Sequence, residues 1–297
     1  MNTQQLKPSL SSPIAGCMRW GVWGSNFSTN DYDLLIKLCI ENGITSFDHA
    51  DIYGDYTTEE EFGRVLLNEP SLRAKMQLIT KAGIQMVSVN RPSHQIKSYN
   101  TSANHLIKSV EQSLKNFRTD YIDVFLIHRP NPLLHPNEVA TAIEKLKEAG
   151  KILSFGVSNF LPHHINQLIS YVKIDYNQIE FSIVNLKQLF NGSLDNCMEH
   201  KITPMGWAPL GGGILTDETH PRFRSIEQIT KQLAEKYNCG ANEILISFIL
   251  KHPSNILPVV GTTKIERLVK AKKAKAIQLT DEEWFMLLQA SKGEEVD

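Results

Sequence analysis

Short hydrophobic segments alternate with longer segments of helical periodicity from about residue 14 to about residue 260. In the longer segments apolar residues recur at the spacing of one face of an amphipathic helix, as in Ala140, Ile143 and Leu146. The short segments are rich in β-branched and aromatic residues and are typical of buried strands. We therefore predict eight strands, at 14–18, 44–48, 76–81, 121–127, 152–158, 176–181, 202–208 and 256–261.

Eight strands separated by helices predict an α/β fold in which a parallel sheet closes into a (β/α)8 barrel, or TIM barrel. An open, doubly wound sheet is the alternative, but the chain contains neither a G-x-G-x-x-G nor a G-x-x-x-x-G-K-[ST] motif. Extra C-terminal helices are expected at about 266–274 and 281–289, the second with Thr280 as its N-cap. We expect residues 1–297 to form a single domain with flexible ends at 1–11 and 291–297.

The composition narrows the class of partner. The 297 residues include 31 Lys and Arg and 32 Asp and Glu, a formal net charge of −1, so the overall charge favours neither nucleic acid nor an anionic membrane. No C-x-x-C pair occurs, and we see neither a signal peptide nor a membrane span. We expect a cytoplasmic protein, monomeric by default, that acts on a small molecule.

Four polar residues stand at or near the ends of predicted strands, where a barrel of this kind carries its reactive groups: Asp48, Tyr53, Lys81 and His128. Such residues are less costly to bury as a cluster than singly. We expect the Lys81 ammonium, held charged by Asp48, to lower the pKa of the Tyr53 phenol toward neutral pH. His128 would face a substrate oxygen. The set lacks a source of electrons, so it requires a cofactor.

Two other reaction classes use residues of the same kind. A hydrolytic metal ion could bind Asp48, His49, Asp51 and His128. However, the first strand has no His-x-His motif, and Lys81 would repel a cation beside Asp48. A Schiff-base aldolase could use Lys81, although pairing with Asp48 would keep that amine protonated. We expect no bound metal, and both classes stay open as alternatives.

Seven segments occur in the order found in the aldo-keto reductase family: FDHADIYG, LITKAG, DVFLIHRP, GVSNF, YNQIEF, GWAPLGGG and PVVGTTKIERL. The chain resembles this family from about Ser12 to about Leu288, and within it the bacterial YdhF-like branch. The resemblance implies a barrel that binds NADP(H) without a Rossmann motif and reduces an aldehyde or ketone to an alcohol by hydride transfer from nicotinamide C4. The family's catalytic tetrad matches Asp48, Tyr53, Lys81 and His128, with the tyrosine as proton donor.

The same resemblance implies a cofactor site. The family's contacts to the nicotinamide carboxamide match Ser158, Asn159 and Gln178, and the ring that stacks on the nicotinamide matches Trp207. The segments that pass the ribose and the pyrophosphate match Gly16, Cys17, Met18, Leu210, Gly211, Gly212 and Gly213. The loop after the eighth strand contributes Gly261, Thr262, Thr263, Lys264 and Arg267.

The preference between NADP(H) and NAD(H) depends on Lys264 and Arg267. Lys264 and Arg267 at a helix start could bind a 2′-phosphate by charge and a bidentate fork, so NADP(H) is expected over NAD(H). The chain departs from the best-known members at Gly261, where they have Lys, and at Ala271, where they have Asn.

The substrate is not set by these motifs. Trp20 and Trp23 follow the first strand and either line an apolar substrate pocket or shelter the barrel mouth. We expect a small carbonyl compound as substrate. Because some family members are cofactor-sensing subunits of larger partners, a binding protein with little turnover is the alternative to an enzyme.

Overall fold

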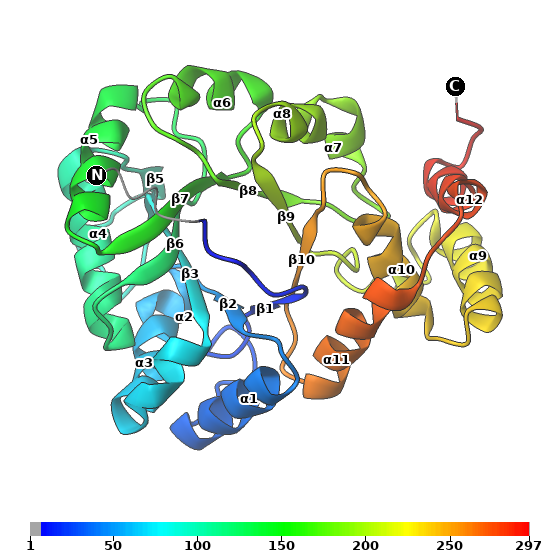
Figure 1. The fold of residues 1–297 in the computed structure, drawn as a ribbon, viewed down its shortest axis with the longest axis horizontal. Helices are drawn as coiled ribbons and strands as arrows, with labels where there is room; N and C mark the ends of the chain where they lie inside the picture. Colours follow the sequence, from blue (N-terminus) through cyan, green and yellow to red (C-terminus); the bar gives the residue numbers. More distant parts are fainter. Residues whose placement is uncertain (1–6, 297) are drawn as a thin grey trace.

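Eight parallel strands close into a barrel in the computed structural model, which describes residues 7–296 (Figure 1). The strands follow the order β1-β10-β9-β8-β7-β6-β3-β2, and β2 pairs with β1 to close the sheet. Their bounds are β1 (Ile14–Gly16), β2 (Ser46–Asp48), β3 (Gln77–Ala82), β6 (Ile122–Ile127), β7 (Ile152–Ser158), β8 (Tyr176–Glu180), β9 (Thr203–Trp207) and β10 (Leu257–Val260). The predicted (β/α)8 fold is confirmed, and all eight predicted strands are present with ends that differ by at most two residues.

Helices surround the barrel (Figure 1). In α4, for example, Leu106, Val110, Leu114 and Phe117 are buried at helical spacing. The α-helices are α1 (Thr29–Glu41), α2 (Tyr53–Tyr56), α3 (Thr58–Asn68), α4 (Ala103–Phe117), α5 (Pro136–Glu148), α6 (Pro162–Ile169), α7 (Lys187–Phe190), α8 (Ser193–Glu199), α9 (Phe223–Lys236), α10 (Ala241–Leu250), α11 (Ile265–Lys273) and α12 (Asp281–Lys292). Short 3-10 helices are η1 (Pro70–Lys75), η2 (Ile214–Thr216) and η3 (Ala274–Ala276). Within residues 7–296, no helix is long and apolar enough to cross a membrane.

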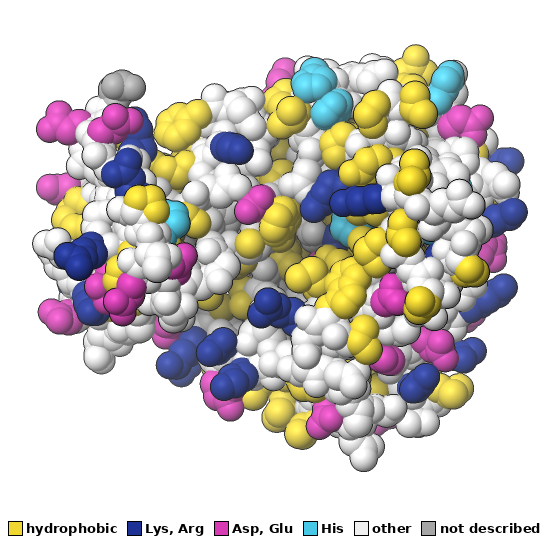
Figure 2. All heavy atoms as spheres, turned by 180° about the vertical axis from the view of Figure 1, so that it is seen from behind, with side chains coloured by type: hydrophobic (Ala, Val, Ile, Leu, Met, Phe, Trp, Pro, Cys, Tyr) yellow, Lys and Arg dark blue, Asp and Glu magenta, His cyan; other side chains and the backbone are white. Residues whose placement is uncertain are grey.

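The stretch between β3 and α4 forms a small antiparallel hairpin of β4 (Ile84–Gln85) and β5 (Ser98–Tyr99). Ile84 pairs with Tyr99, and both pack in an apolar cluster that includes Tyr53 and Tyr56 of α2. The hairpin follows β3 directly, so it lies at the carboxyl end of the barrel. Figure 2 shows this end of the molecule, which is hollowed near its centre.

The chain before β1 crosses the opposite end of the barrel (Figure 1). Lys7 Nζ donates to the Asp175 carbonyl at 2.7 Å and to Thr203 Oγ1 at 2.5 Å, and the Tyr176 hydroxyl donates to the Pro8 carbonyl at 2.6 Å. Within the predicted flexible end at 1–11, Lys7 and Pro8 thus contact residues at the starts of β8 and β9, and Ser11 forms hydrogen bonds with Thr45 and Ser46 at the start of β2. Residues 1–6 of that predicted end lie outside the described residues.

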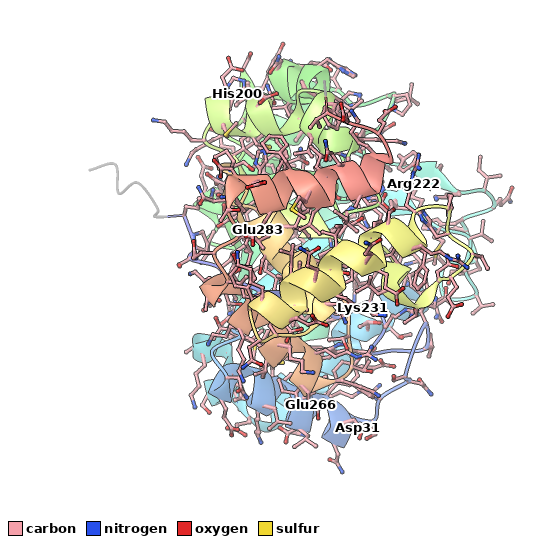
Figure 3. The ribbon with its side chains drawn as sticks, turned by 90° about the vertical axis from the view of Figure 1, so that its right-hand side faces the viewer. Asp31, His200, Arg222, Lys231, Glu266 and Glu283 are labelled. Carbon is pink, nitrogen blue, oxygen red and sulfur yellow. The ribbon has the colours of Figure 1, made fainter. Side chains whose placement is uncertain are left out.

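Helix α12 packs beside α9 on the outside of the barrel (Figure 3). It begins with the predicted capping box: Thr280 Oγ1 accepts from the Glu283 amide, and Glu283 Oε2 accepts from the Thr280 amide. Glu283 also accepts hydrogen bonds from Lys236 and Tyr237, both at 2.6 Å.

The segment at 291–297, for which the sequence predicts a flexible end, makes contacts of its own. Helix α12 continues to Lys292, the Ser291 hydroxyl donates to the Ile183 carbonyl, and Val296 packs against the apolar cluster around α9, α10 and α12. Apolar packing and a backbone acceptor thus hold this part of the chain, and residue 297 lies outside the described range.

The Glu283→Gln substitution should reduce stability in a pH-dependent way. Burial alone would raise the pKa of Glu283, but the hydrogen bonds from Lys236, Tyr237 and Thr280 outweigh it and lower the pKa to about 2. A depressed carboxyl pKa stabilises the fold above the unfolded-state pKa, and this contribution is lost as the pH falls toward the folded-state pKa. We expect the free energy of unfolding in urea to fall by about 2 kcal/mol at pH 7. The difference from wild type should shrink as the pH falls from about 5 to about 3.

Its control is the exposed neighbour on the same helix, Glu282→Gln, which should leave the free energy of unfolding near the wild-type value at every pH. A loss at Glu283→Gln that does not change with pH would contradict the role of the carboxylate charge.

Candidate active site

Four polar side chains meet at the carboxyl ends of neighbouring strands. Asp48 ends β2, Lys81 lies near the end of β3, His128 directly follows β6, and Tyr53 begins α2. Lys81 Nζ lies 2.8 Å from the Asp48 carboxylate and 3.2 Å from the Tyr53 hydroxyl. The Tyr53 and His128 ring centroids are 6.0 Å apart. The structure thus places together the four residues that the sequence singled out.

The Lys81 ammonium is fully enclosed, with 1% of its side chain exposed. It donates to Asp48, to the His49 carbonyl at 2.6 Å and to Tyr53, so each of its three N–H groups has an acceptor. Burial lowers the pKa of Lys81, but the charge and hydrogen bonds of Asp48 and Tyr53 outweigh it and raise the pKa. A permanently charged amine is a poor nucleophile, which disfavours Schiff-base chemistry at this position.

Asp48 has a second polar partner across the barrel. Its Oδ1 accepts a hydrogen bond of 2.7 Å from Gln178 Nε2 of β8. The Asp48 carboxylate therefore has two partners, the Gln178 amide and the Lys81 ammonium. These two contacts fix the orientation of the carboxylate, and Asp48 is only 2% exposed.

The electrostatic effect on Tyr53 differs from the sequence prediction. Burial raises the pKa of the Tyr53 phenol, and the opposing charge of Lys81 only reduces that increase, so the pKa lies above its ordinary value. The prediction of a lowered pKa was wrong because it included the nearby cation and left out desolvation. Tyr53 is therefore a neutral phenol at neutral pH.

His128 is held neutral. Burial lowers its pKa well below the ordinary value, and the charges of Lys81 and Arg129 add to this effect. Its Nδ1 is buried without a hydrogen-bond partner among the described residues. A neutral imidazole can donate a hydrogen bond to an oxygen without carrying a charge.

A short left-handed turn carries Tyr53. Gly54, Asp55 and Tyr56 have φ values of 57°, 60° and 70°. A Cβ on Gly54 would collide with Thr58 Oγ1. The loop after β4 secures the turn, because the Tyr56 hydroxyl accepts from the Met86 amide at 2.9 Å. Such strained backbone persists only where its surroundings hold it.

The residues that we expect at the nicotinamide lie at or near the carboxyl ends of β7, β8 and β9. Ser158 ends β7 and Asn159 follows it, Gln178 lies in β8, and Trp207 ends β9. Trp207 Nε1 donates to Asn159 Oδ1 at 3.2 Å, and Asn159 Nδ2 donates to Ser158 Oγ at 3.1 Å. Gln178, bonded to Asp48, joins this group to the four residues above.

The glycine loop after β9 offers room at the rim of the barrel. Gly211, Gly212 and Gly213 have φ values of 58°, 70° and 102°, which other residues rarely adopt. A Cβ on Gly212 would meet no atom within 4 Å, and the same holds for Gly261 after β10. This open, glycine-lined edge is what a bound pyrophosphate needs, because backbone N–H groups can approach it closely.

Other residues expected near the cofactor lie around the same edge. A Cβ on Gly16 would lie 3.3 Å from the Cα of Gly261, so the backbones of these two glycines pass close to each other. Cys17 is buried in the core and Met18 is 42% exposed beyond β1. Leu210 is half-buried and packs against two apolar clusters. Burial raises the pKa of Cys17 well above its ordinary value, so its thiol is unreactive.

Two exposed cations stand at the start of α11. Lys264 is the N-cap of this helix and Arg267 lies in its first turn. Neither forms an ion pair with a carboxylate within residues 7–296. The two cations are therefore free to bind an anion.

The two threonines before them form hydrogen bonds in the same loop. Thr262 Oγ1 accepts from the Lys264 amide at 3.2 Å, and Thr263 Oγ1 accepts from the Ser25 hydroxyl at 3.5 Å.

Ala271, the position of a second departure from well-known family members, is 6% exposed and belongs to the apolar core beneath α11.

Trp20 and Trp23 have different surroundings. Trp20 is fully buried against Tyr32 and Phe47 at ring-centroid distances of 5.6 and 6.1 Å, and its Nε1 donates to the Thr262 carbonyl at 3.0 Å. The option that Trp20 lines the substrate pocket was wrong, because its ring packs in the core behind β2. Trp23 is 38% exposed, with its ring centroid 6.2 Å from that of Tyr53.

The sequence prediction missed Arg129 at the barrel mouth. Its Nη1 donates to the His128 carbonyl at 2.8 Å and to Ser158 Oγ at 3.1 Å. The signal that could have found it is its position, one residue after a histidine that ends a strand.

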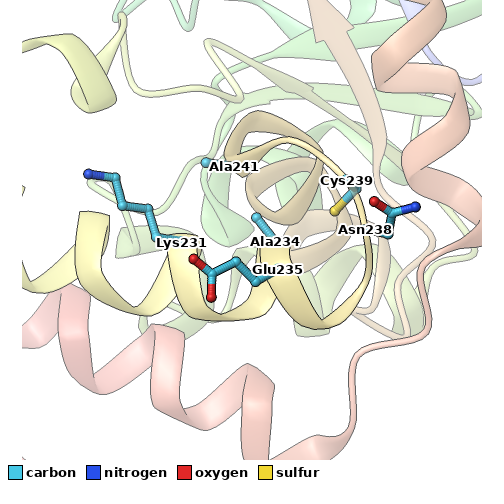
Figure 4. Close-up of a pocket in the computed structure, with 6 residues that line it drawn as sticks. All are labelled: Lys231, Ala234, Glu235, Asn238, Cys239 and Ala241. Carbon is cyan, nitrogen blue, oxygen red and sulfur yellow. The ribbon is translucent and has the colours of Figure 1, made fainter.

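Two surface hollows lie away from this mouth. One, of about 580 Å³, lies beside α9 and α10 and is lined by Lys231, Ala234, Glu235, Asn238, Cys239 and Ala241 (Figure 4). The other, of about 390 Å³, lies between α3, α4 and the hairpin and includes Asp51 and Glu59. Neither contains a residue of the tetrad or of the expected cofactor site. Across the described residues, no group of three His, Cys, Asp or Glu side chains is arranged to hold a metal.

The ion pair at the centre of the site can be tested by a double-mutant cycle. Asp48→Asn and Lys81→Met should each lower the free energy of unfolding in urea by about 3 to 5 kcal/mol, because each leaves a buried charge unpaired. The double variant should lose less than the sum, since it buries neither charge. Strictly additive losses would show that the two groups do not depend on each other.

Comparison with known proteins agrees with this arrangement. The family model described as "Aldo/keto reductase family" matches residues 14–292. The uncharacterized oxidoreductase YcsN of Bacillus subtilis is 42% identical, with 96% of each chain covered. The oxidoreductase YdhF of Escherichia coli is 37% identical, with 97% of this chain and 96% of that protein covered. A 6-dehydroglucose reductase of Agrobacterium fabrum is 36% identical, with 93% and 94% covered.

A solved structure shares the fold. The aldo/keto reductase of Klebsiella pneumoniae, in complex with NADP and acetate, superposes with a TM-score of 0.75 and 23% identity, covering 95% of this chain and 91% of that one. The barrel, the family match over nearly the whole chain and the identity to YcsN and YdhF lead to one conclusion. The chain belongs to the aldo/keto reductase family of oxidoreductases, in its bacterial YdhF-like branch.

Proposed function

We propose that this chain is an NADPH-dependent reductase that converts an aldehyde or ketone into the corresponding alcohol, with Tyr53 as the proton donor. The observation that carries the proposal is the Tyr53 hydroxyl held 3.2 Å from the buried Lys81 ammonium, beside a neutral His128. This is a neutral acid next to a group that stabilises its conjugate base. Family membership and the fold support the same reaction class.

The proton moves from Tyr53 to the substrate oxygen. The raised pKa of Tyr53 keeps the phenol protonated until negative charge develops on that oxygen. Lys81 then stabilises the phenolate, and Asp48 with Gln178 keeps the ammonium in position. His128, neutral and next to Tyr53, donates a hydrogen bond that orients the substrate carbonyl.

NADPH, when bound, supplies the hydride that reduces the carbonyl carbon. Ser158, Asn159 and Gln178 would hold the carboxamide, because they offer the amide and hydroxyl groups that match it. Trp207 would stack on the nicotinamide ring. The glycine loop 211–213 and the segments around Gly16 and Gly261 would pass along the pyrophosphate and ribose.

The 2′-phosphate of NADPH would contact Lys264 and Arg267, which stand exposed and without an ion pair among the described residues at the start of α11. NADP in the solved structure of the Klebsiella relative supports this coenzyme class. The preference for NADPH over NADH is our inference from the charge of these two residues.

The Tyr53→Phe variant should lower kcat for NADPH-dependent reduction of a panel of aldehydes and ketones by at least about a hundredfold, because it removes the proton donor. In wild type the rate of reduction should stay constant from about pH 6 to about pH 9, since a donor with a raised pKa stays protonated through that range. The assay follows NADPH absorbance over a pH series.

The exposed Tyr171→Phe is the control and should retain wild-type kinetics. Equal turnover by Tyr53→Phe would remove Tyr53 from the reaction. NADPH binding without turnover of any carbonyl in wild type would indicate the cofactor-sensing alternative.

Lys264→Met and Arg267→Met should each raise the KM for NADPH about tenfold and change the KM for NADH less than about twofold, because only NADPH carries the 2′-phosphate. Steady-state kinetics with both coenzymes measure this. Lys270→Met, an exposed cation further along the same helix, is the matched control. Parallel increases for NADPH and NADH would contradict the assignment.

A further inference from the structure

Arg129 is a half-buried cation at the barrel mouth. It directly follows His128, and its guanidinium carbon lies 5.7 Å from the centroid of the Trp207 ring. Its Nη1 makes hydrogen bonds to the His128 carbonyl and to Ser158 Oγ. The guanidinium is therefore held by the ends of β6, β7 and β9, next to the residues proposed to bind the carbonyl and the nicotinamide.

Among residues 7–296, the charge of Arg129 has no counter-ion within ion-pair distance. Arg73, a buried arginine elsewhere in the barrel, pairs with Asp123 at 2.7 Å, and the Lys81 ammonium pairs with Asp48. Arg129 forms no ion pair with any carboxylate in residues 7–296, and Glu180 acts on it only at longer range. A partly buried charge is normally paired, so an unpaired one at a site mouth indicates that the partner arrives with a ligand.

Its donors are also incompletely used. A guanidinium has five N–H groups, and both side-chain hydrogen bonds of Arg129 come from Nη1. Within the described chain, Nε and Nη2 have no acceptor. A planar fork of this kind matches a carboxylate or a phosphate, which can accept two parallel hydrogen bonds.

A second cation acts on the same mouth. The charge of Lys97, an exposed residue in the segment between β4 and β5, contributes to lowering the pKa of His128, after burial and the charges of Lys81 and Arg129. The whole chain has a net charge of −1, so the positive charge at the mouth does not reflect an overall positive charge of the chain. Figure 2 shows Lys and Arg side chains beside a histidine near the hollow of this face.

We infer that Arg129 selects carbonyl substrates that carry an anionic group, a carboxylate or a phosphate, a few bonds from the reacting carbon. The inference rests on the proposed function and names the substrate class for that site. In this arrangement the substrate carbonyl lies at Tyr53 and His128, and the anionic group of the substrate lies at Arg129. Trp23, next to Tyr53, covers the apolar carbon atoms of the substrate between these two groups. Neutral hydroxyl groups could also accept from Arg129, but they would leave its charge unpaired.

Three four-carbon aldehydes test this choice: butanal, 4-hydroxybutanal and 4-oxobutanoate, which end in a methyl, a hydroxyl and a carboxylate group. We expect kcat/KM of wild type to be at least about tenfold higher for 4-oxobutanoate than for butanal. In Arg129→Met this ratio should fall toward one. Arg129→Lys, which keeps the charge and loses the fork, should give an intermediate ratio.

Arg64→Met, the same substitution on the exposed face of α3, is the control and should keep the wild-type ratio. Thermal unfolding checks that each variant is folded. A measurement on wild type alone is independent of folding defects: raising the salt concentration from about 0.05 M to about 0.5 M should reduce the ratio, because the attraction between the charges is screened.

A ratio near one in wild type, an unchanged ratio in Arg129→Met, or a higher kcat/KM for 4-hydroxybutanal than for 4-oxobutanoate would overturn the inference. Each of these leaves the reductase function intact. Failure of the proposed function is different, because none of the three aldehydes would then be reduced with NADPH.

Discussion

The structure of the site depends on one buried cation. The Lys81 ammonium has almost no contact with solvent, and an ammonium in such surroundings requires an anion and full hydrogen bonding. Asp48 supplies the anion from the neighbouring strand, while the His49 carbonyl and the Tyr53 hydroxyl accept the remaining donors. Because the ammonium needs all three acceptors, it fixes the position of Tyr53 relative to β2 and β3.

The barrel makes this arrangement possible because parallel strands end at one edge. β2 and β3 are hydrogen-bonded neighbours, and Asp48 pairs with Ile79 of β3. Lys81 lies two residues beyond Ile79 in the same strand, at the edge of the barrel where Asp48 ends β2. Gln178 approaches Asp48 from β8 on another side of the barrel. The left-handed turn after Tyr53 is then secured by the loop beyond β4, because the Met86 amide donates to the Tyr56 hydroxyl.

Much of this could be predicted from the sequence. The eight strands were recognisable from their apolar character and spacing, and Asp48, Lys81 and His128 from their places at strand ends. What the sequence could not give is the balance of energies at a buried group: the pKa of Tyr53 rises because desolvation outweighs the nearby Lys81 charge. Nor could it show that Trp20 turns into the core while Trp23 stays at the mouth, since both follow the same strand. The contacts of Lys7 and Pro8 depend on residues at the starts of β8 and β9, which are distant in sequence, so no local pattern reveals them.

We propose that the polar cluster at the barrel mouth serves hydride transfer to a carbonyl carbon. The most direct test of this proposal is a reaction of the protein with a reducible aldehyde and NADPH that carries deuterium at nicotinamide C4, followed by NMR of the alcohol. We expect one deuterium on the carbinol carbon of the product when the label is on the transferred face. An alcohol that carries no deuterium with either face labelled, or that takes it from deuterated solvent at that carbon, would contradict it.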